Sequence, residues 1–358
     1  MRISIRSTDV LSLLGVLAIG LMVWVELSKK EVKEPYFDEK MEAAMRMRAS
    51  ILYLKDKHFK NEISVDNIND PNDTKIIGTQ FSPITSGKGS LPSKLSTVNP
   101  NVAALVVELF KEAGLKKGDH IAMCATGSFP ALNIAVCTAA EVMGLKTSLI
   151  VSVTSSSWGA NDPDYTYLDI HSSLTEGGFL QQGIIAASIG GNDDLGKTLS
   201  AEGRDLAAAA INRNNLEIIS EGSLSESIER RLALFKTREL LEPGKISAFV
   251  NIGGGIASLG SARNAVILPS GVIHEIKLRQ FPDKQGVMFA MAAGGTKIIN
   301  FLNVNLLFDR YKLPEDPVPL PQPGTGELFY KLKYNYLYVL GALLTLVSAL
   351  VAVILFDK

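Results

Sequence analysis

Two long uncharged stretches stand near the two ends of the chain. The first runs from Val10 to Val25 and the second from Leu337 to Phe356. A helix needs about 20 mostly apolar residues to cross a bilayer, so the pattern predicts membrane-spanning helices over 8–27 and 336–356. Two spans would place both termini on one side of the lipid bilayer and the region between them on the other.

Between the spans, short apolar runs typical of buried strands alternate with segments of helical spacing. The predicted strands are 120–124, 147–153, 183–189, 216–219 and 247–252, and the predicted helices are 37–57, 102–113, 131–143, 201–212 and 224–241. This alternation predicts parallel strands joined by right-handed crossovers. We therefore expect a doubly wound, mainly parallel, Rossmann-like α/β domain over 36–313.

Two segments break the alternation. Residues 61–95 are rich in Asn, Asp, Pro, Ser, Thr and Gly, and we expect irregular structure there, with a short strand at Ile76 and Ile77. Residues 314–323 contain five prolines. This composition predicts that 314–335 is a stiff, extended linker to the second span.

The residues beside the spans bear on processing and orientation. The first apolar run ends without a small-x-small cleavage site, which favours an uncleaved signal anchor over a removed signal peptide. Arg2 and Arg6 precede it and favour a cytoplasmic N-terminus, which would place the domain outside. Charges on the domain side oppose this only weakly, because long domains translocate largely regardless of charge. We expect a two-pass protein of the cell (inner) membrane with an extracytoplasmic domain. The lysines on the domain side leave the reverse orientation open.

Composition narrows the function. The chain has 358 residues, 46% of them hydrophobic and 20% charged, so most of it must fold. The formal net charge of −1 argues against a nucleic-acid partner. Cys124 and Cys137 belong to no zinc pattern and are expected to be buried. No metal site is assigned, and the sequence names no cofactor.

Three polar loops follow predicted strands, and ligands of open α/β sheets bind beyond the carboxyl ends of the strands. The first loop, 125–130, offers Thr126, Gly127 and Ser128 at a helix N-terminus, where free N–H groups favour an anion. Gly127 would let a ligand approach the backbone. The loop matches neither a phosphate-binding P-loop nor a nucleophile elbow, and a simple capping turn is the alternative.

The second loop, 154–164, is dense in hydroxyls, amides and carboxylates. Its expected ligand-binding residues are Ser156, Trp158, Asn161 and Asp164. Asp162 and Asp164, together with Asp169 and His171, could bind a hard cation or take part in acid–base chemistry. A solvated, self-capping turn is the alternative.

The third loop contains Gly253, Gly254 and Gly255 directly after a predicted strand. Consecutive glycines cost backbone entropy, so they indicate a positive φ or the close approach of a ligand. We expect Gly253 and Gly254 to line the same crevice as the other loops, with a tight structural turn as the alternative.

The motifs ATGSFPALN, SSSWGANDPDYTYLDI, TEGG and NIGGG occur together between two terminal membrane helices. In this combination the chain resembles the bacterial poly-gamma-glutamate system protein, a family encoded beside the membrane ligase machinery of capsule biosynthesis. The resemblance covers most of the chain. It implies a role in making, exporting or anchoring poly-γ-glutamate, with the membrane proteins of that synthesis as partners. It brings no established catalytic residues.

Three functions follow. The leading one is an accessory membrane component of poly-γ-glutamate synthesis or export, whose crevice binds an anionic glutamyl chain or a small ligand. The alternative is a membrane-anchored hydrolase or amide-transfer enzyme acting on the polymer, with Ser128 as nucleophile and His171 and Asp162 as helpers. The third is a structural tether whose α/β domain has no catalysis.

Overall fold

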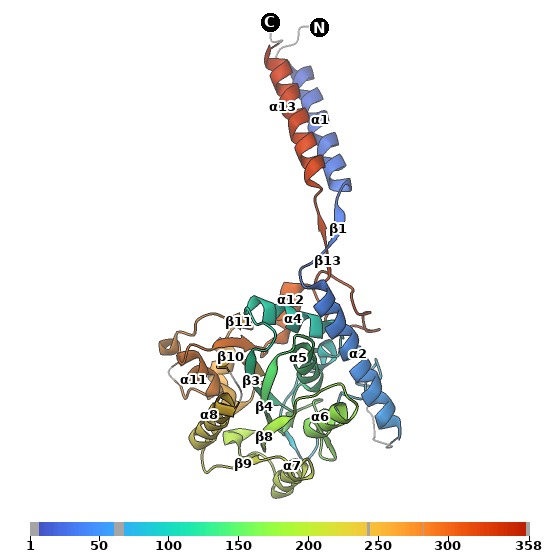
Figure 1. Ribbon diagram of the computed structural model, residues 1–358. Helices are drawn as coiled ribbons and strands as arrows, with labels where there is room; N and C mark the ends of the chain where they lie inside the picture. The colour runs from blue at the N-terminus through green and yellow to red at the C-terminus, as the bar shows by residue number, and fades with distance from the viewer. Residues whose placement is uncertain (1–6, 61–67, 242–243, 282, 356–358) are drawn as a thin grey trace. The chain divides into compact units, whose positions relative to one another are not determined.

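A computed structural model describes residues 7–60, 68–241, 244–281 and 283–355 (Figure 1). The flanking residues Arg2, Arg6 and Phe356 lie outside this set. The chain divides into two compact units. One comprises 1–35 and 329–358, and the other comprises 36–328.

The first unit contains two helices that are long and apolar enough to cross a membrane, α1 (Thr8–Leu27) and α13 (Tyr336–Leu355). Both begin and end within one residue of the predicted spans. The two helices pack against each other. The strand after α1, β1 (Lys30–Lys33), pairs antiparallel with the strand before α13, β13 (Tyr330–Lys333). The Trp24 and Tyr338 rings lie 4.7 Å apart, at one end of the helix pair.

The helix α13 packs against α1, and a narrow stripe along it is less exposed than the rest. Ala342 is buried there, while Leu346, Ala349 and Val353 are half-buried. Their spacing is that of one helix face. The rest of α13 exposes large apolar side chains, as expected of a helix surrounded by lipid.

The second unit is mixed α/β and contains a seven-stranded, mostly parallel sheet. Its strand order is β11–β12–β10–β3–β4–β8–β9. The strands are β3 (His120–Thr126), β4 (Lys146–Ser152), β8 (Ile184–Ser188), β9 (Ile218–Ile219), β10 (Ile246–Ile252), β11 (Gly271–Ile273) and β12 (Lys297–Asn300). All neighbouring pairs are parallel except β11 with β12. The five predicted strands are therefore confirmed, and β11 and β12 extend the sheet beyond them.

Helices cover both faces of this sheet (Figure 1). On one side lie α2 (Phe37–Lys60), α4 (Asn101–Glu112), α5 (Pro130–Val142) and α6 (Tyr167–Glu176), and on the other lie α8 (Leu224–Leu241) and α11 (Val287–Ala293). The remaining helices are α3 (Leu91–Thr97), α7 (Ala201–Arg213), α9 (Ile256–Leu259), α10 (Ala262–Ile267) and α12 (Val304–Tyr311). β3 is buried along its whole length because helices pack on both its faces. Aromatic packing continues into the helices, with Phe235 of α8 lying 6.2 Å from Phe249 of β10.

Two expectations about irregular segments need correction. Ile76 and Ile77 are buried but form no strand; the strand of this region is β2 (Thr85–Gly87), which pairs in parallel with β5 (Ser155–Ser156). The segment predicted to be a stiff, extended linker belongs to the α/β unit as far as Leu328. Asn101 of α4 donates to the carbonyl oxygen of Gln322 and accepts from the Gly324 N–H. These hydrogen bonds hold the segment on the α/β unit.

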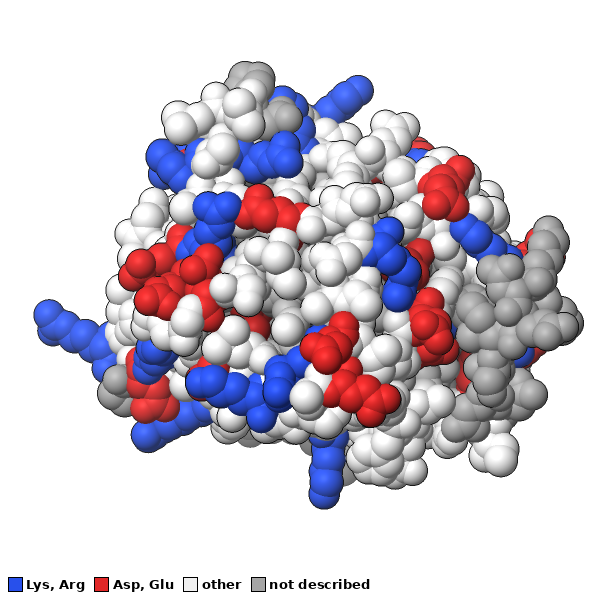
Figure 2. Space-filling model, turned by 90° about the horizontal axis from the view of Figure 1, so that it is seen from below, with Lys and Arg blue, Asp and Glu red and all other residues white. Residues whose placement is uncertain are grey.

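The two cysteines are free and buried, as predicted. Figure 2 shows one face of the molecule, on which basic and acidic side chains are interspersed. Neither sign of charge therefore forms a large separate patch on this face.

Candidate functional site

The loops after β3, β4 and β10 open on one pocket of about 450 Å³. Because parallel strands end at the same edge of a sheet, the polar segments that follow them gather there, as the strand directions predict. The loop after β8 joins them. The lining residues are Ser86, Gly87, Lys88, Thr126, Ser128, Phe129, Ser152, Thr154, Ser156, Gly191, Asn192, Thr198, Gly254, Gly255 and Ile256. Hydroxyl groups and glycine backbone dominate this lining, and Lys88 is its charged side chain.

The first loop brings Thr126 and Ser128 to the pocket, just before the N-terminus of α5. The Ser128 N–H donates to Thr126 Oγ1 at 3.3 Å, which fixes the turn. Gly127 has a different role from the predicted one. Its N–H donates to the Ser152 carbonyl oxygen, and a Cβ at this position would lie 2.5 Å from the carbonyl oxygen of Val153. Gly127 therefore allows two protein loops to approach each other, and it does not line the pocket.

The second loop does not stand free in solvent, because its backbone pairs with the segment around β2. Trp158 has a φ of 60° and exchanges backbone hydrogen bonds with that segment, accepting from Gly78 and donating to Thr79. Asn161 is fully buried. Its side chain accepts from the Thr79 N–H at 3.0 Å and donates to the Thr79 carbonyl oxygen at 2.8 Å. Asn161 thus clamps the two segments together, and of the four expected contacts in this loop only Ser156 lines the pocket.

Thr154, at the start of the same loop, was not singled out from the sequence. It is 3% exposed and lines the pocket. Its Oγ1 has no hydrogen-bond partner within the described part of the chain. A buried hydroxyl without a partner costs free energy, so this group is suited to a bound ligand.

The third loop contributes Gly254 and Gly255 to the pocket, whereas Gly253 supports the turn. Gly253 has a φ of 86°, and a Cβ there would lie 2.6 Å from Thr126 Oγ1. Both the left-handed backbone and the close approach of the first loop require glycine.

The structure does not bring Ser128, His171 and Asp162 together. His171 is buried in α6, where its Nε2 lies 3.0 Å from the Gln182 carbonyl oxygen and its Nδ1 lies 3.5 Å from the Tyr167 hydroxyl. Burial lowers the pKa of His171 to about 4, so the ring is neutral near pH 7. Ser128 Oγ instead accepts the Ser156 N–H at 3.0 Å.

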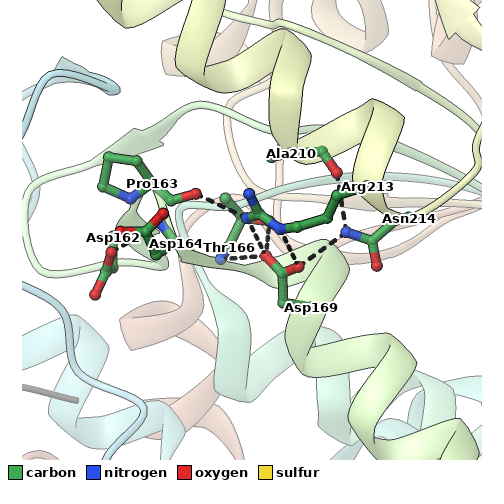
Figure 3. A network of polar contacts seen from close by, with 8 residues as sticks. All are labelled: Asp162, Pro163, Asp164, Thr166, Asp169, Ala210, Arg213 and Asn214. Carbon is green, nitrogen blue, oxygen red and sulfur yellow. Dashed lines mark hydrogen bonds and ion pairs between the residues drawn. The ribbon is translucent and has the colours of Figure 1, made fainter. Parts of the chain in front are cut away.

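Asp162, Asp164 and Asp169 belong to a separate polar network (Figure 3). Arg213 of α7 binds both oxygens of Asp169, with contacts of 2.8 Å and 2.7 Å. Burial would raise the pKa of Asp169, but the Arg213 guanidinium and nearby hydrogen-bond donors hold it below its ordinary value. Asp162 Oδ1 accepts the Asp164 N–H. No group of His, Cys, Asp or Glu in the described residues is arranged to hold a metal ion.

The most unusual residue of the site is Lys94 of α3, which sequence reasoning missed. Lys94 is 2% exposed, and its Nζ donates to Ser156 Oγ at 2.9 Å and to the Ser128 carbonyl oxygen. The same Nζ lies 3.8 Å from the centre of the Phe129 ring. Lysine is almost never fully buried, and nothing in the local pattern LPSKLST marks this one.

A buried ion pair lies beside the pocket wall. Arg231 of α8 and Asp194 are each 2% exposed, and they are 2.7 Å apart. Ser188 and Ser227 donate to the Asp194 carboxylate at 2.8 Å and 2.6 Å. Ser152, which lines the pocket, lies 3.3 Å from the same carboxylate. This network fixes the loop after β8 against the pocket.

Comparison of the chain with protein-family models, with curated proteins and with solved structures found no match.

Proposed function

We propose that the protein is a membrane-anchored binding component of poly-γ-glutamate synthesis or export, whose pocket holds a carboxylate-bearing glutamyl chain or a related small anion. The observation that carries the binding proposal is the lining of the pocket: hydroxyls, glycine backbone and Lys88, without a carboxylate side chain among the described lining residues. The pathway itself rests on the resemblance of the sequence motifs. The proposal includes an uncleaved anchor in the inner membrane and an extracytoplasmic domain.

The position of the pocket supports a ligand site. The chain passes from β3 outward to β4, β8 and β9, and then returns to β10 on the other side of β3. We infer from this reversal a doubly wound, Rossmann-like sheet, in which ligands bind at the point where the strand order reverses. Thr126 after β3 and Gly254 after β10 lie at that point and line the pocket.

The electrostatics favour an anion. α5 begins at Pro130 and has 13 residues, so the positive end of its dipole lies beside Ser128. The carboxylates of Asp162 and Asp164, which would repel an anion, are not among the lining residues. A glutamyl carboxylate could thus receive hydrogen bonds from hydroxyls and backbone N–H groups without an opposing charge.

The binding test is a titration of the full-length protein in detergent with a γ-linked glutamate oligomer. We expect Lys88→Ala to weaken binding roughly threefold to tenfold, because an exposed lysine contributes modestly. Thr154→Val, which keeps the shape and removes the hydroxyl, should weaken it by about tenfold. The matched control Lys236→Ala removes an exposed lysine on α8 and should leave the affinity unchanged.

Two results would count against this function. Affinity that is insensitive to both pocket substitutions would place the oligomer elsewhere. Deletion of the gene without any change in cell-associated or released polymer would remove the pathway assignment while leaving the pocket open to another anion.

A further inference from the structure

Lys94 and Ser156 place an amine against a hydroxyl at the wall of the pocket. Their Nζ and Oγ atoms are 2.9 Å apart, within the range over which a proton is shared. Ser156 lines the pocket, while Lys94 lies behind it and is 2% exposed. The described contacts of Lys94 Nζ are to Ser156, to the Ser128 carbonyl oxygen and to the Phe129 ring, none of which is a carboxylate.

An ammonium group held in this environment loses its hydration without gaining a counter-ion. Burial therefore lowers the pKa of Lys94 to about 7. The helices packed against α3 are α5 and α12. Their titratable and charged groups are Cys137 and Glu141 of α5 and Asp309, Arg310 and Tyr311 of α12, with Lys88 in the segment after β2. None of these groups perturbs Lys94, because desolvation is the cause of the shift. A substantial fraction of Lys94 is thus the free amine near neutral pH.

Ser128 completes the arrangement. Its Oγ accepts the Ser156 N–H at 3.0 Å, so its own hydroxyl proton remains available to the pocket. A donor in this position can stabilise an oxyanion that forms beside Ser156. The unpartnered Oγ1 of Thr154 lies in the same lining.

We propose that Ser156 and Lys94 form a nucleophile–base pair that transfers the acyl group of a carboxylate-bearing amide. The inference rests on the proposed function, because the same pocket must hold the anionic acyl chain. Serine with lysine as its base is a known variant of the serine–histidine arrangement. The nucleophile is therefore Ser156, not Ser128, and the base is Lys94, not His171.

The reaction balances with water or an amine as the acceptor. Ser156 Oγ forms a bond to the amide carbonyl carbon while its proton passes to the Lys94 amine. The carbon–nitrogen bond then breaks, and the Lys94 ammonium returns the proton to the leaving amine. A water or acceptor amine next attacks the acyl-serine ester and gives its proton to Lys94, which passes it to Ser156 Oγ as the ester bond breaks. Water yields a carboxylic acid, whereas an amine yields a new amide.

The test uses a fluorophosphonate probe on the full-length protein in detergent. Attack by Ser156 forms an oxygen–phosphorus bond and releases fluoride, and peptide mass spectrometry locates the adduct. We expect labelling of Ser156, with a rate that rises between about pH 6 and about pH 8 as Lys94 loses its proton. Ser156→Ala should abolish the adduct. Lys94→Arg, which keeps a cation but cannot act as a base, should slow it by about 100-fold or more.

Controls separate a catalytic role from a structural one. Ser225→Ala removes an exposed hydroxyl of α8 that does not line the pocket, and it should leave the labelling rate unchanged. Thermal unfolding of Lys94→Arg shows whether the variant is folded. If it is not, Lys94→Ala with added propylamine replaces it. The added amine should restore the labelling rate if Lys94 acts as a base, but not if Lys94 only supports the structure.

Three outcomes would overturn the proposal. Absence of an adduct on Ser156 in the folded protein would remove the nucleophile, and a labelling rate independent of pH and of Lys94 would remove the base. Either result leaves the binding function intact if Ser156→Ala still binds the glutamate oligomer. Labelling of Ser156 in a protein that does not bind the oligomer would instead reject the anionic substrate class together with the proposed function.

Discussion

Loss of Arg231 gives the sharpest test of how the pocket is supported. Arg231 and Asp194 are each 2% exposed, and the guanidinium lies 2.7 Å from the carboxylate. Replacement of Arg231 by Met keeps an unbranched apolar side chain and removes the cation. The carboxylate of Asp194 would then stay buried with serine hydroxyls as its described donors.

The expected loss follows from this burial. Removing one partner of a buried pair typically costs about 3–5 kcal/mol, because the remaining charge stays in a poor solvent. For Arg231→Met we expect the free energy of unfolding to fall by about 3 kcal/mol, since the hydroxyl donors remain. Asp194→Asn should lose a similar amount, and Asn tolerates the φ of 65° at this position. The double variant should lose less than the sum of the two single losses.

Urea unfolding of the full-length protein in mild detergent, followed by far-ultraviolet circular dichroism, measures these losses. Arg230→Met is the matched control, because Arg230 is the adjacent residue of α8 and pairs with Glu217 at the exposed surface. It should cost less than about 1 kcal/mol. Equal losses for the two arginine variants, or additive losses in the double variant, would refute the argument that burial makes this pair important.

Three further predictions concern other parts of the chain. Gly127→Val should destabilise the protein by about 2 kcal/mol or more in urea unfolding, because the added Cβ would press on a backbone carbonyl oxygen; a loss below about 0.5 kcal/mol would contradict that contact. Burial lowers the pKa of His171 from 6.5 to about 4, so the unfolded chain takes up a proton at a higher pH than the folded chain does. The free energy of unfolding should therefore fall as the pH drops from about 6.5 to about 4, and His171→Gln should make this pH dependence weaker. Phe81→Cys, at an exposed position, should react in intact cells with a membrane-impermeant thiol reagent once any outer membrane is breached; labelling only after lysis would place the domain in the cytoplasm. The native Cys124 and Cys137 should not react with the reagent, because both are buried and burial raises their pKa to about 12.

The sequence by itself determined the elements whose signal is local. Length and lack of charge defined α1 and α13, because a span depends on composition over a continuous stretch. Apolar runs with helical segments between them defined β3, β4 and β10 and their parallel direction. From that direction the meeting of three loops at one pocket followed, before any side chain was placed.

The roles of individual residues were decided by tertiary contacts. Asn161 and Gly127 resemble ligand-binding residues in the sequence, yet both hold protein segments against each other. Asp169 resembles a free acid, but Arg213, 44 positions further along the chain, binds both its oxygens. Such pairings depend on which distant segments pack together, and local spacing does not encode that.

Lys94 shows the same limit most clearly. Its neighbours in the sequence form an ordinary short helix, and a lysine in such a helix is normally exposed to solvent. Only the packing of α3 against the loops after β3 and β4 removes water from its amine and sets it against Ser156. The chemistry of the pocket thus depends on burial, which is a property of the whole fold, whereas its location depends on strand order and direction, which the hydrophobic pattern already contained.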